Sequence, residues 1–410
     1  MSGGQSPAVE EAQPAGARAR WVSLFGATAA QVGISYLEQG VAALVPYLKA
    51  DYHLSSAAAG LFGTSINVGR AFAAALSARP VDRFGERPMI LVGGCASGVL
   101  AILAALAPTA PATFVLLLLS GVAQTAAILA GITAIAMWFR AGTRGIAMGI
   151  RQAAVPVGGA LAAASLPPLA FEFGWRDALI TAGGIEIGVT LVGMLIYRDY
   201  AGAGRRETVT PRLRAAVSSV VRDRDVSRAV LAGTVLAAGQ FVTLAYIQLF
   251  LVEDLHASLR LAAVVLAVIE VAGIAGRLAW GAISDLVFAG QRRGVLLAIL
   301  ALAALGSIGM ALSASGPGLA LAVPMSVLLG FTIVGSPGIY VTLISDLSKP
   351  EYDSATMGIG LAFIQSSALV VPPVFGGLAD ATSSYRAAWL ALAALLTATL
   401  LAVRQIRRSA

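Results

Sequence analysis

The sequence predicts an all-α polytopic membrane protein, with 12 transmembrane helices arranged as two pseudo-symmetric six-helix bundles. Three observations predict this class. Of the 410 residues, 58% are hydrophobic and only 12% are charged, and the mean hydropathy is +0.83, values typical of a chain surrounded by lipid. The apolar residues form twelve stretches, each about long enough to cross a hydrocarbon core of about 30 Å as a helix. The two halves of the chain also resemble one another.

The first element is a cytoplasmic N-terminal tail at residues 1–20, rich in Ala, Gly, Pro and Glu. No basic segment directly precedes a short apolar core there, so no cleavable signal peptide is predicted. The first six-helix bundle follows at residues 21–197. Its predicted spans are 21–48, 57–78, 88–107, 112–138, 145–168 and 176–197.

A polar segment at residues 198–226 contains seven arginines and separates the two halves. Its polarity predicts a cytoplasmic linker. The second six-helix bundle occupies residues 227–404, and residues 405–410 form a cytoplasmic tail. The predicted spans of this bundle are 227–251, 259–284, 294–313, 318–345, 354–378 and 386–404.

The basic residues predict the orientation, because Lys and Arg resist translocation. The side that carries the tails and the linker has 21 of them, whereas the opposite side has four: Lys49, Arg176, Arg260 and Arg386. Both termini are therefore expected in the cytoplasm, in a bacterial cytoplasmic (inner) membrane. The net charge of +7 lies in short clusters between spans, so the lipid bilayer, and no nucleic acid, is the expected partner.

An internal repeat supports the same division. Asp51 and Asp254 follow the first and seventh spans at an offset of 203, and Asp82 and Asp285 share that offset. Gly69-Arg70 and Gly276-Arg277 recur at 207, and Met148-Gly149-Ile150 and Met357-Gly358-Ile359 at 209. Four matches in the same order indicate a duplicated six-helix unit.

The loop after the second span carries a motif, Ala78-Arg79-Pro80-Val81-Asp82-Arg83-Phe84-Gly85-Glu86-Arg87. It resembles the signature G-x-x-x-D-R-x-G-R-[KR] of the major facilitator superfamily, with Ala78 in place of the first glycine and Glu86 in place of a basic residue. The second copy, Gly281 to Asp285, keeps the glycine and the aspartate. The resemblance covers nearly the whole chain and implies a secondary transporter with the major facilitator fold.

In such a loop an aspartate flanked by arginines can form a charge network that locks one side of the transporter. The gating residues expected on this basis are Asp82, Arg83, Arg87 and Asp285. They could instead be interfacial charges that only set orientation. Pro156 and Gly158 in the fifth span add a second gating hypothesis, because they permit helix bending.

Two arginines within the spans predict an anionic substrate. Arg70 lies twelve residues before Asp82, and Arg277 lies eight residues before Asp285, which is about 18 Å and 12 Å along a helix. A charge at such depth is costly and typically faces a cavity or a partner. Guanidinium offers a planar pair of donors that matches carboxylates. Pairing of these arginines with Glu38 or Glu270, as structural ion pairs, is the alternative.

The arginine of the eighth span followed by Gly-x-x-Ser-Asp, here Arg277 to Asp285, is similar to that of oxalate/formate antiporters and monocarboxylate transporters. Arginines in the second and eighth spans also resemble those of nitrate transporters, although the glycine-rich fifth-span signature of that group is absent. A small organic anion is therefore the expected substrate. Neutral side chains expected to assist are Tyr36, Asn67, Gln152 and Tyr340, which could equally hold helices together.

Glu270 lies seven residues before Arg277, on the same helix face. It could pair with Arg277 in the empty site and take a proton when an anion arrives, which would couple proton and substrate. Glu38 is the rival proton carrier. Glu186 lies in the sixth span and is expected to serve packing or partner contacts, and not transport. Arg151 lies close enough to the cytoplasmic end of its span to extend towards water.

The chain has one cysteine and no phosphate-binding loop, so no metal, cofactor, ATP drive or enzymatic activity is predicted. The sequence thus predicts a monomeric secondary transporter that moves a small mono- or dicarboxylate by proton symport or exchange with a counter-anion. A proton-coupled exporter of multiple drugs, an inorganic oxyanion transporter and a receptor that does not transport remain alternatives.

Overall fold

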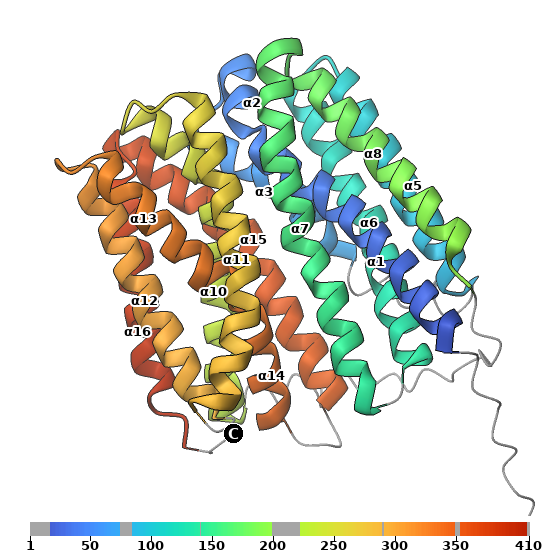
Figure 1. Ribbon diagram of the computed structural model, residues 1–410. Helices are drawn as coiled ribbons and strands as arrows, with labels where there is room; N and C mark the ends of the chain where they lie inside the picture. Colours follow the sequence, from blue (N-terminus) through green and yellow to red (C-terminus); the bar gives the residue numbers. More distant parts are fainter. Residues whose placement is uncertain are drawn as a thin grey trace, which may run out of the picture.

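A computed structural model describes the protein at residues 17–73, 84–139, 141–198, 222–288, 291–348 and 353–407. Over these residues the chain is helical and contains no β-strand (Figure 1). The helices of the first half are α1 (Ala17–Ala43), α2 (Val45–Tyr52), α3 (Ser56–Ala73), α5 (Glu86–Leu106), α6 (Ala110–Trp138), α7 (Ala141–Phe173) and α8 (Trp175–Ile196).

Over its described residues, the second half contains one π-helical segment, η1, among its α-helices. Its elements are α10 (Arg224–Glu253), α11 (Leu259–Leu286), α12 (Arg292–Ser313), α13 (Leu319–Leu329), η1 (Gly330–Val334), α14 (Pro337–Leu347), α15 (Asp353–Thr382) and α16 (Arg386–Val403). Each of the twelve predicted spans is occupied by helix over its described residues, so the predicted all-α, polytopic class is confirmed.

Two predicted spans are interrupted helices. Pro46 has no amide hydrogen, and the first span divides just before it, at Leu44, into α1 and α2, which reaches Tyr52 instead of ending at residue 48. The tenth span divides into α13, η1 and α14, because the chain leaves regular helix at Gly335 and restarts at Pro337. A proline is well placed in the first turn of the new helix, where no amide donor is needed.

Ten helical segments in the described ranges are long and apolar enough to cross a membrane, and α1 and α3 are not among them. These two helices occupy the first two predicted spans. They carry Glu38, Gln39, Asn67 and Arg70, and these polar side chains lower their hydropathy. Both helices therefore bring polar groups into the membrane interior.

The helices fall into two groups that lie side by side, α1 to α8 and α10 to α16 (Figure 1). The groups meet chiefly where α7 packs on α11 and α3 packs on α15. We call the end at which α1 begins and α16 ends the linker end. The opposite end, where α2 lies and where the polar contacts described below join the two halves, is the closed end.

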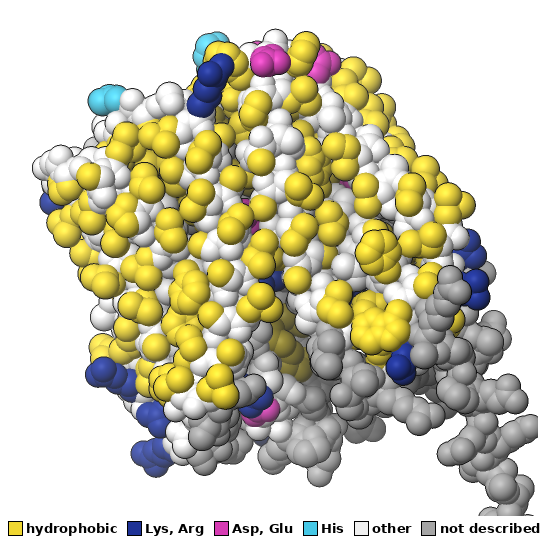
Figure 2. All heavy atoms as spheres, viewed as in Figure 1, with side chains coloured by type: hydrophobic (Ala, Val, Ile, Leu, Met, Phe, Trp, Pro, Cys, Tyr) yellow, Lys and Arg dark blue, Asp and Glu magenta, His cyan; other side chains and the backbone are white. Residues whose placement is uncertain are grey.

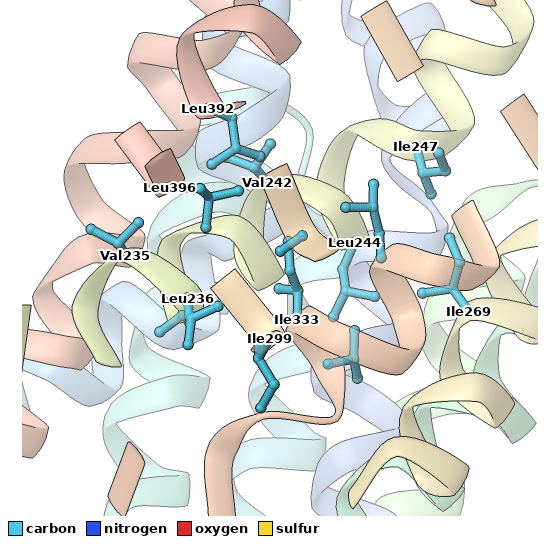
Figure 3. Packing of buried hydrophobic residues seen from close by; sticks show 14 of the residues in the cluster. Val235, Leu236, Val242, Leu244, Ile247, Ile269, Ile299, Ile333, Leu392 and Leu396 are labelled. Carbon is cyan, nitrogen blue, oxygen red and sulfur yellow. The ribbon is translucent and has the colours of Figure 1, made fainter. Parts of the chain in front are cut away.

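The second half is packed around α10. Its residues Leu236 and Val242 are buried against Ile299 of α12, Ile333 of η1 and Leu396 of α16 (Figure 3). Outward-facing side chains are also apolar, as Leu195, Leu278 and Leu286 are 78%, 70% and 85% exposed. Apolar side chains cover both halves in Figure 2. Such a surface is stable in lipid and would aggregate in water.

The repeat detected in the sequence has a backbone counterpart at the closed end. His53 and His256 follow the first and seventh spans, and their φ angles are 51° and 53°. A left-handed conformation is uncommon for residues other than glycine. Two equivalent positions therefore keep the same unusual turn, which supports duplication of the six-helix unit.

Candidate functional site

Arg70 of α3 forms an ion pair with Glu38 of α1, within the first half. Its Nη2 atom also donates to Oδ1 of Asn67 at 2.5 Å. The side chains of Arg70 and Glu38 are only 12% and 14% exposed, so each charge is compensated mainly by the other. Pairing of Arg70 with Glu38, one of the two sequence hypotheses, is therefore what the structure shows.

Arg277 of α11 has different partners. Its Nη1 atom donates to the backbone carbonyl of Gln152 at 2.9 Å, and its Nε atom donates to that of Val334 at 3.2 Å. Gln152 lies in α7, in the other half of the molecule. No carboxylate among the described residues forms an ion pair with Arg277, and the expected contact with Glu270 is not made in this conformation.

Pro156 explains why the Gln152 carbonyl is available. In a regular helix that oxygen would accept from the amide of residue 156, four positions later, and proline has no amide hydrogen. α7 nevertheless continues through Pro156 to Phe173. The unpaired carbonyl is therefore satisfied from the opposite half of the protein, by Arg277.

Glu270 is buried, with 1% of its surface exposed, and its Oε2 atom has no hydrogen-bond partner. It faces the first half of the chain. A Cβ atom added at Gly159 of α7 would lie 2.7 Å from the Glu270 carboxyl carbon and 2.5 Å from Nε2 of Gln39. Only a residue without a side chain allows α7, Gln39 and Glu270 to meet this closely.

A small cavity lies beside these groups, with a volume of about 30 Å³. Its lining includes Glu38, Asn67 and Thr64 of the first half and Gln240 and Phe241 of the second. A cavity of this size holds one or two water molecules. The two halves are therefore nearly in contact here, and a substrate needs them to separate.

The other expected substrate residues lie around this interface, and no hydrogen bond of the described structure joins their side chains to Arg277. Tyr36 is buried in the first half, where its hydroxyl lies 2.7 Å from Oγ of Ser165. The Gln152 side chain is exposed, and it is the backbone of this residue that contacts Arg277. The ring of Tyr340 packs against Gly233, since a Cβ there would lie 2.9 Å from the ring.

The expected gating residues are only partly visible. Asp82 and Arg83 lie outside the described residues, as does the side chain of Asp285. Arg87 lies in the first turn of α5. Gly158 is a point of close packing, because a Cβ there would lie 2.7 Å from the Val32 carbonyl oxygen in α1.

The expectation that Arg151 extends towards water is wrong. It is 2% exposed, and its Nη2 atom donates to Gln31 Oε1 at 2.7 Å and to the Ile128 carbonyl at 3.0 Å. These acceptors lie in α1 and α6. The guanidinium is thus held inside the first half, because neighbouring helices supply acceptors that the sequence of α7 does not reveal.

Glu186 packs within the first half, as expected. Its carboxylate accepts from Ser97 Oγ at 3.0 Å and from Gln124 Nε2 at 3.3 Å, and it is fully buried. Ser97 belongs to α5 and Gln124 to α6. This network ties three helices of one half together and makes no contact with the second half that the described residues show.

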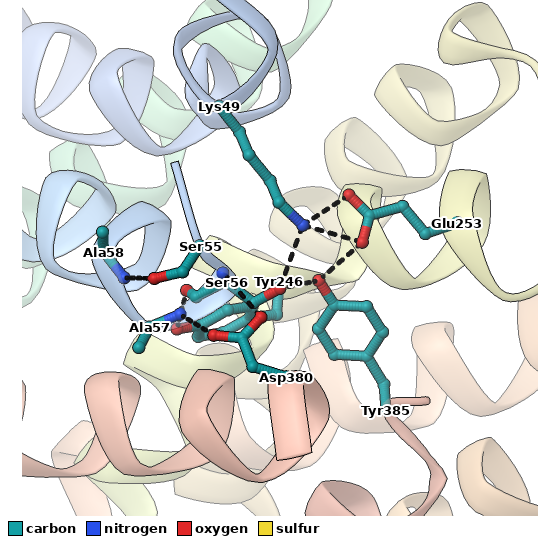
Figure 4. A network of polar contacts seen from close by, with 9 residues as sticks. All are labelled: Lys49, Ser55, Ser56, Ala57, Ala58, Tyr246, Glu253, Asp380 and Tyr385. Atoms are coloured by element: carbon teal, nitrogen blue, oxygen red, sulfur yellow. Dashed lines mark hydrogen bonds and ion pairs between the residues drawn. The ribbon is translucent and has the colours of Figure 1, made fainter. Parts of the chain in front are cut away.

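The closed end carries a second set of polar contacts, which the sequence did not predict (Figure 4). The Asp380 carboxylate of α15 accepts from the backbone amides of Ser56 and Ala57 at 2.9 and 3.0 Å. These amides begin α3, so a side chain of the second half caps a helix of the first. Lys49 and Glu253 form an ion pair of 2.7 Å at the same junction.

Two tyrosines complete this junction. The Tyr246 hydroxyl lies 2.8 Å from the Ser56 carbonyl oxygen and 2.6 Å from that of Pro372, so it connects α10 to both α3 and α15. A Cβ atom at Gly60 would lie only 1.8 Å from this hydroxyl. The Tyr385 hydroxyl lies 3.2 Å from Ser56 Oγ in the first half and 3.0 Å from Oε2 of Glu253 in its own half. These contacts join the two halves at the closed end.

The fold and this interface define a class of protein: a helical membrane transporter of two similar halves that bury charged groups where they meet. The chain belongs to the Major Facilitator Superfamily, whose family model matches residues 24–372 and again 229–409. The family therefore also accounts for the twelve spans and the duplicated unit. Its members are transporters, so the protein is not an enzyme.

Curated relatives agree with this assignment. An MFS-type transporter of Mycobacterium tuberculosis is 26% identical over 377 residues, which cover 92% of this chain and 83% of the relative. The hexuronate transporter of Bacillus subtilis is 21% identical and covers 91% of this chain and 92% of its own. The fujikurins efflux protein of Gibberella fujikuroi is 25% identical, over 76% of this chain and 64% of its own.

Among solved structures, a bacterial homologue of the human lysosomal transporter Spinster, in an inward-facing and occupied conformation, has a TM-score of 0.77 and 16% identity. The match covers 96% of this chain and 98% of that one. At this identity the likeness concerns the fold. It confirms that the arrangement of the described helices is that of a major facilitator transporter.

Proposed function

We propose that the protein is a secondary active transporter of a small organic anion, a mono- or dicarboxylate, that works by alternating access. The observation that supports this most is the environment of Arg277, whose guanidinium donates, within the described residues, to two neutral backbone carbonyls. Its positive charge is not neutralised by direct contact with a carboxylate of the described residues. A carboxylate substrate is a stronger partner for that planar pair of donors than two carbonyl oxygens.

Substrate binding at Arg277 would then change the contact between the halves. An anion that takes the guanidinium releases the Gln152 carbonyl of α7, the partner that now joins α11 to the first half. Differential binding of this kind is what an alternating-access cycle requires, since a ligand shifts a conformational equilibrium only by preferring one state. Arg70 would join the site when its pair with Glu38 opens.

For coupling, we propose Glu270 before Glu38. Glu38 has a cationic partner in Arg70, whereas Glu270 is buried and its Oε2 atom has no hydrogen-bond partner. Burying an unpaired charge is costly, so a proton that neutralises Glu270 would stabilise the packed arrangement. Proton symport and anion exchange both fit this scheme. The abundance of Lys and Arg at the linker end supports cytoplasmic termini in a bacterial inner membrane, and one chain contains the whole site, as expected for a monomer.

The test is thermal stabilisation of the purified protein by mono- and dicarboxylates, nitrate and the lipophilic cation tetraphenylphosphonium. A ligand at about one hundred times its Kd stabilises by about 2.7 kcal/mol. Stabilisation by a carboxylate should vanish in Arg277→Gln, be weakened in Arg277→Lys, which keeps the charge without the paired donors, and persist in Arg386→Gln, a control at the exposed start of α16.

Other results of the same stabilisation test would favour one of the alternative functions. Stabilisation by nitrate alone would favour an inorganic oxyanion transporter. Stabilisation by tetraphenylphosphonium that is unchanged in Arg277→Gln would overturn the anion site and favour an exporter of drugs that uses the glutamates. Absence of counterflow of every stabilising ligand in proteoliposomes would favour a receptor.

A further inference from the structure

A groove of about 700 Å³ lies between α7 and α11, on the side of the molecule that faces lipid. It is separate from Arg277 and from the small cavity beside Glu38. Its walls are small and apolar, among them Ala164 and Pro168 of α7 and Val264, Val268 and Val271 of α11. Val264 and Val271 are 58% and 57% exposed. The groove therefore opens to the membrane along the seam between the two halves.

The groove has the length of one lipid chain. It runs along α11 from Arg260, in the first turn of that helix at the closed end, to Val271. Eleven residues of helix correspond to about 16 Å, which is about half of a hydrocarbon core of about 30 Å. A groove that begins at the membrane surface and ends near the midplane matches an acyl chain of a single leaflet.

Two opposite charges stand at the surface end of this groove, and neither is neutralised by the other. Arg260 lies over the ring of Phe171, with its Cζ atom 5.4 Å from the ring centroid. Glu172 follows Phe171 and also lines the groove. Within the described ranges neither Arg260 nor Glu172 forms an ion pair. A free cation and a free anion here are complementary to a headgroup that carries a phosphate and an ammonium.

We propose that this groove binds one phosphatidylethanolamine molecule from the leaflet at the closed end. One acyl chain lies between α7 and α11, the phosphate contacts Arg260 and the ammonium donates to Glu172. Phosphatidylglycerol offers the same phosphate and chains but no ammonium. The groove is thus a selective lipid site on the two helices that carry Gln152 and Arg277, and it does not depend on the nature of the transported substrate.

Native mass spectrometry of the delipidated full-length protein tests this with dioleoyl-phosphatidylethanolamine and dioleoyl-phosphatidylglycerol. The protein should retain one phosphatidylethanolamine, with at least about fivefold weaker retention of phosphatidylglycerol. Arg260→Gln should weaken both lipids by about fivefold. Glu172→Gln should remove the preference, bringing the ratio of the two lipids to about one. Arg386→Gln, which changes a charge at the same end outside the groove, should leave both unchanged.

Occupation of the groove itself is tested by filling it. Ala164→Trp should abolish retention, whereas Val192→Trp, which adds a similar ring to the exposed surface of α8, should not. Val268→Trp on the facing wall serves the same purpose if Ala164→Trp does not fold. Equal retention of the two lipids by the parent protein, or a ratio unaffected by Arg260→Gln and Glu172→Gln, would overturn the proposal and show unselective annular lipid.

Discussion

The guanidinium of Arg277 and the backbone carbonyl of Gln152 meet at 2.9 Å across the boundary between the two halves. One partner is a charge inside a membrane helix, and the other is a carbonyl that Pro156 leaves without its helical donor. Each group would be costly to bury alone, and each satisfies the other. Pro156 therefore removes a hydrogen bond within α7 and, by the same absence, leaves an acceptor for the contact between the halves.

We expect Pro156→Ala to be energetically coupled to Arg277→Gln. Alanine restores the amide that bonds to the Gln152 carbonyl, so this amide competes with Arg277 for the acceptor and weakens the contact between the halves. In the Arg277→Gln background that contact is already lost, so Pro156→Ala should stabilise the protein there by more than in the parent, with a difference of about 1.5 kcal/mol. Thermal unfolding of the four proteins measures this difference.

Pro168→Ala provides the matched control for this cycle. Pro168 lies in the same helix and lines the lipid groove. The carbonyl that it leaves without a helical donor, four residues earlier, is not one of the acceptors of Arg277 in the described structure. Its effect on stability should add to that of Arg277→Gln. If the effects of Pro156→Ala and Arg277→Gln on the free energy of unfolding also add, the contact between Arg277 and the Gln152 carbonyl does not contribute to stability.

Asp380→Asn should favour separation of the halves at the closed end. Asparagine keeps one acceptor for the amides of Ser56 and Ala57 but loses the charge, and hydrogen bonds to a charged group contribute about 1.5–3 kcal/mol. We expect the population open at this end to rise by about tenfold. Labelling of Ala57→Cys by a maleimide, in a Cys95→Ser background, should accelerate accordingly.

Asp254→Asn is the control for this experiment. The Asp254 carboxylate accepts from Ser384 Oγ at 2.8 Å and from the Tyr385 amide at 2.9 Å, the same kind of contact made within the second half. Its replacement can lower stability but does not remove a contact between halves. Equal acceleration of labelling in both variants would mean that Asp380 does not hold the closed end together.

At the closed end, low pH should weaken the contact between α2 and α8. The indole of Trp175 donates to Asp51 at 2.9 Å and Arg176 lies 3.0 Å away, and this environment lowers the pKa of Asp51. A lowered pKa in the folded protein means that the contact stabilises above the unfolded value of about 3.9 and is lost as pH falls through the folded value.

The difference in unfolding temperature between the parent and Asp51→Asn should therefore be constant from pH 7 to pH 5 and shrink below about pH 4. Its size should be about 1 °C, because the Asp51 side chain is 44% exposed. Trp175→Phe removes the main donor and should remove most of the pH-dependent part. A difference that stays constant down to pH 3 would contradict this account.

The sequence predicted the helices well because the length and hydrophobicity of a span are properties of one continuous segment of the chain. It placed Arg70 and Glu38 in the first two spans, but only the packing of α1 on α3 shows that they pair. The proline rule identifies the Gln152 carbonyl as unpaired. No property of α7 alone, however, identifies Arg277, over a hundred positions later, as its donor.

The closed end was missed for a similar reason. In the sequence Lys49 is one of four positive residues on its side of the membrane, and its partner Glu253 lies 204 residues later, in the other half of the chain. Asp380 caps a helix more than three hundred residues earlier in the chain. Capping patterns within a helix are visible in a sequence, whereas a cap supplied by the other half depends on how the halves pack.

Glu270→Gln should separate the proton from the substrate. The variant keeps the shape of the buried side chain beside Gln39 and Gly159 but cannot gain or lose a proton. If Glu270 carries the proton, accumulation of the anion driven by a pH gradient should disappear in proteoliposomes. Exchange of labelled for unlabelled anion should persist, because exchange needs no net proton movement.

Glu38→Gln is the comparison that assigns the role. It frees Arg70 from its ion pair, so it should change the apparent affinity for the anion while the pH gradient still drives accumulation. The reverse result, with accumulation lost in Glu38→Gln and kept in Glu270→Gln, would transfer the proton to the first half. In that case release of Glu38 from Arg70 would join proton and anion in one step, since the same arginine would receive the substrate.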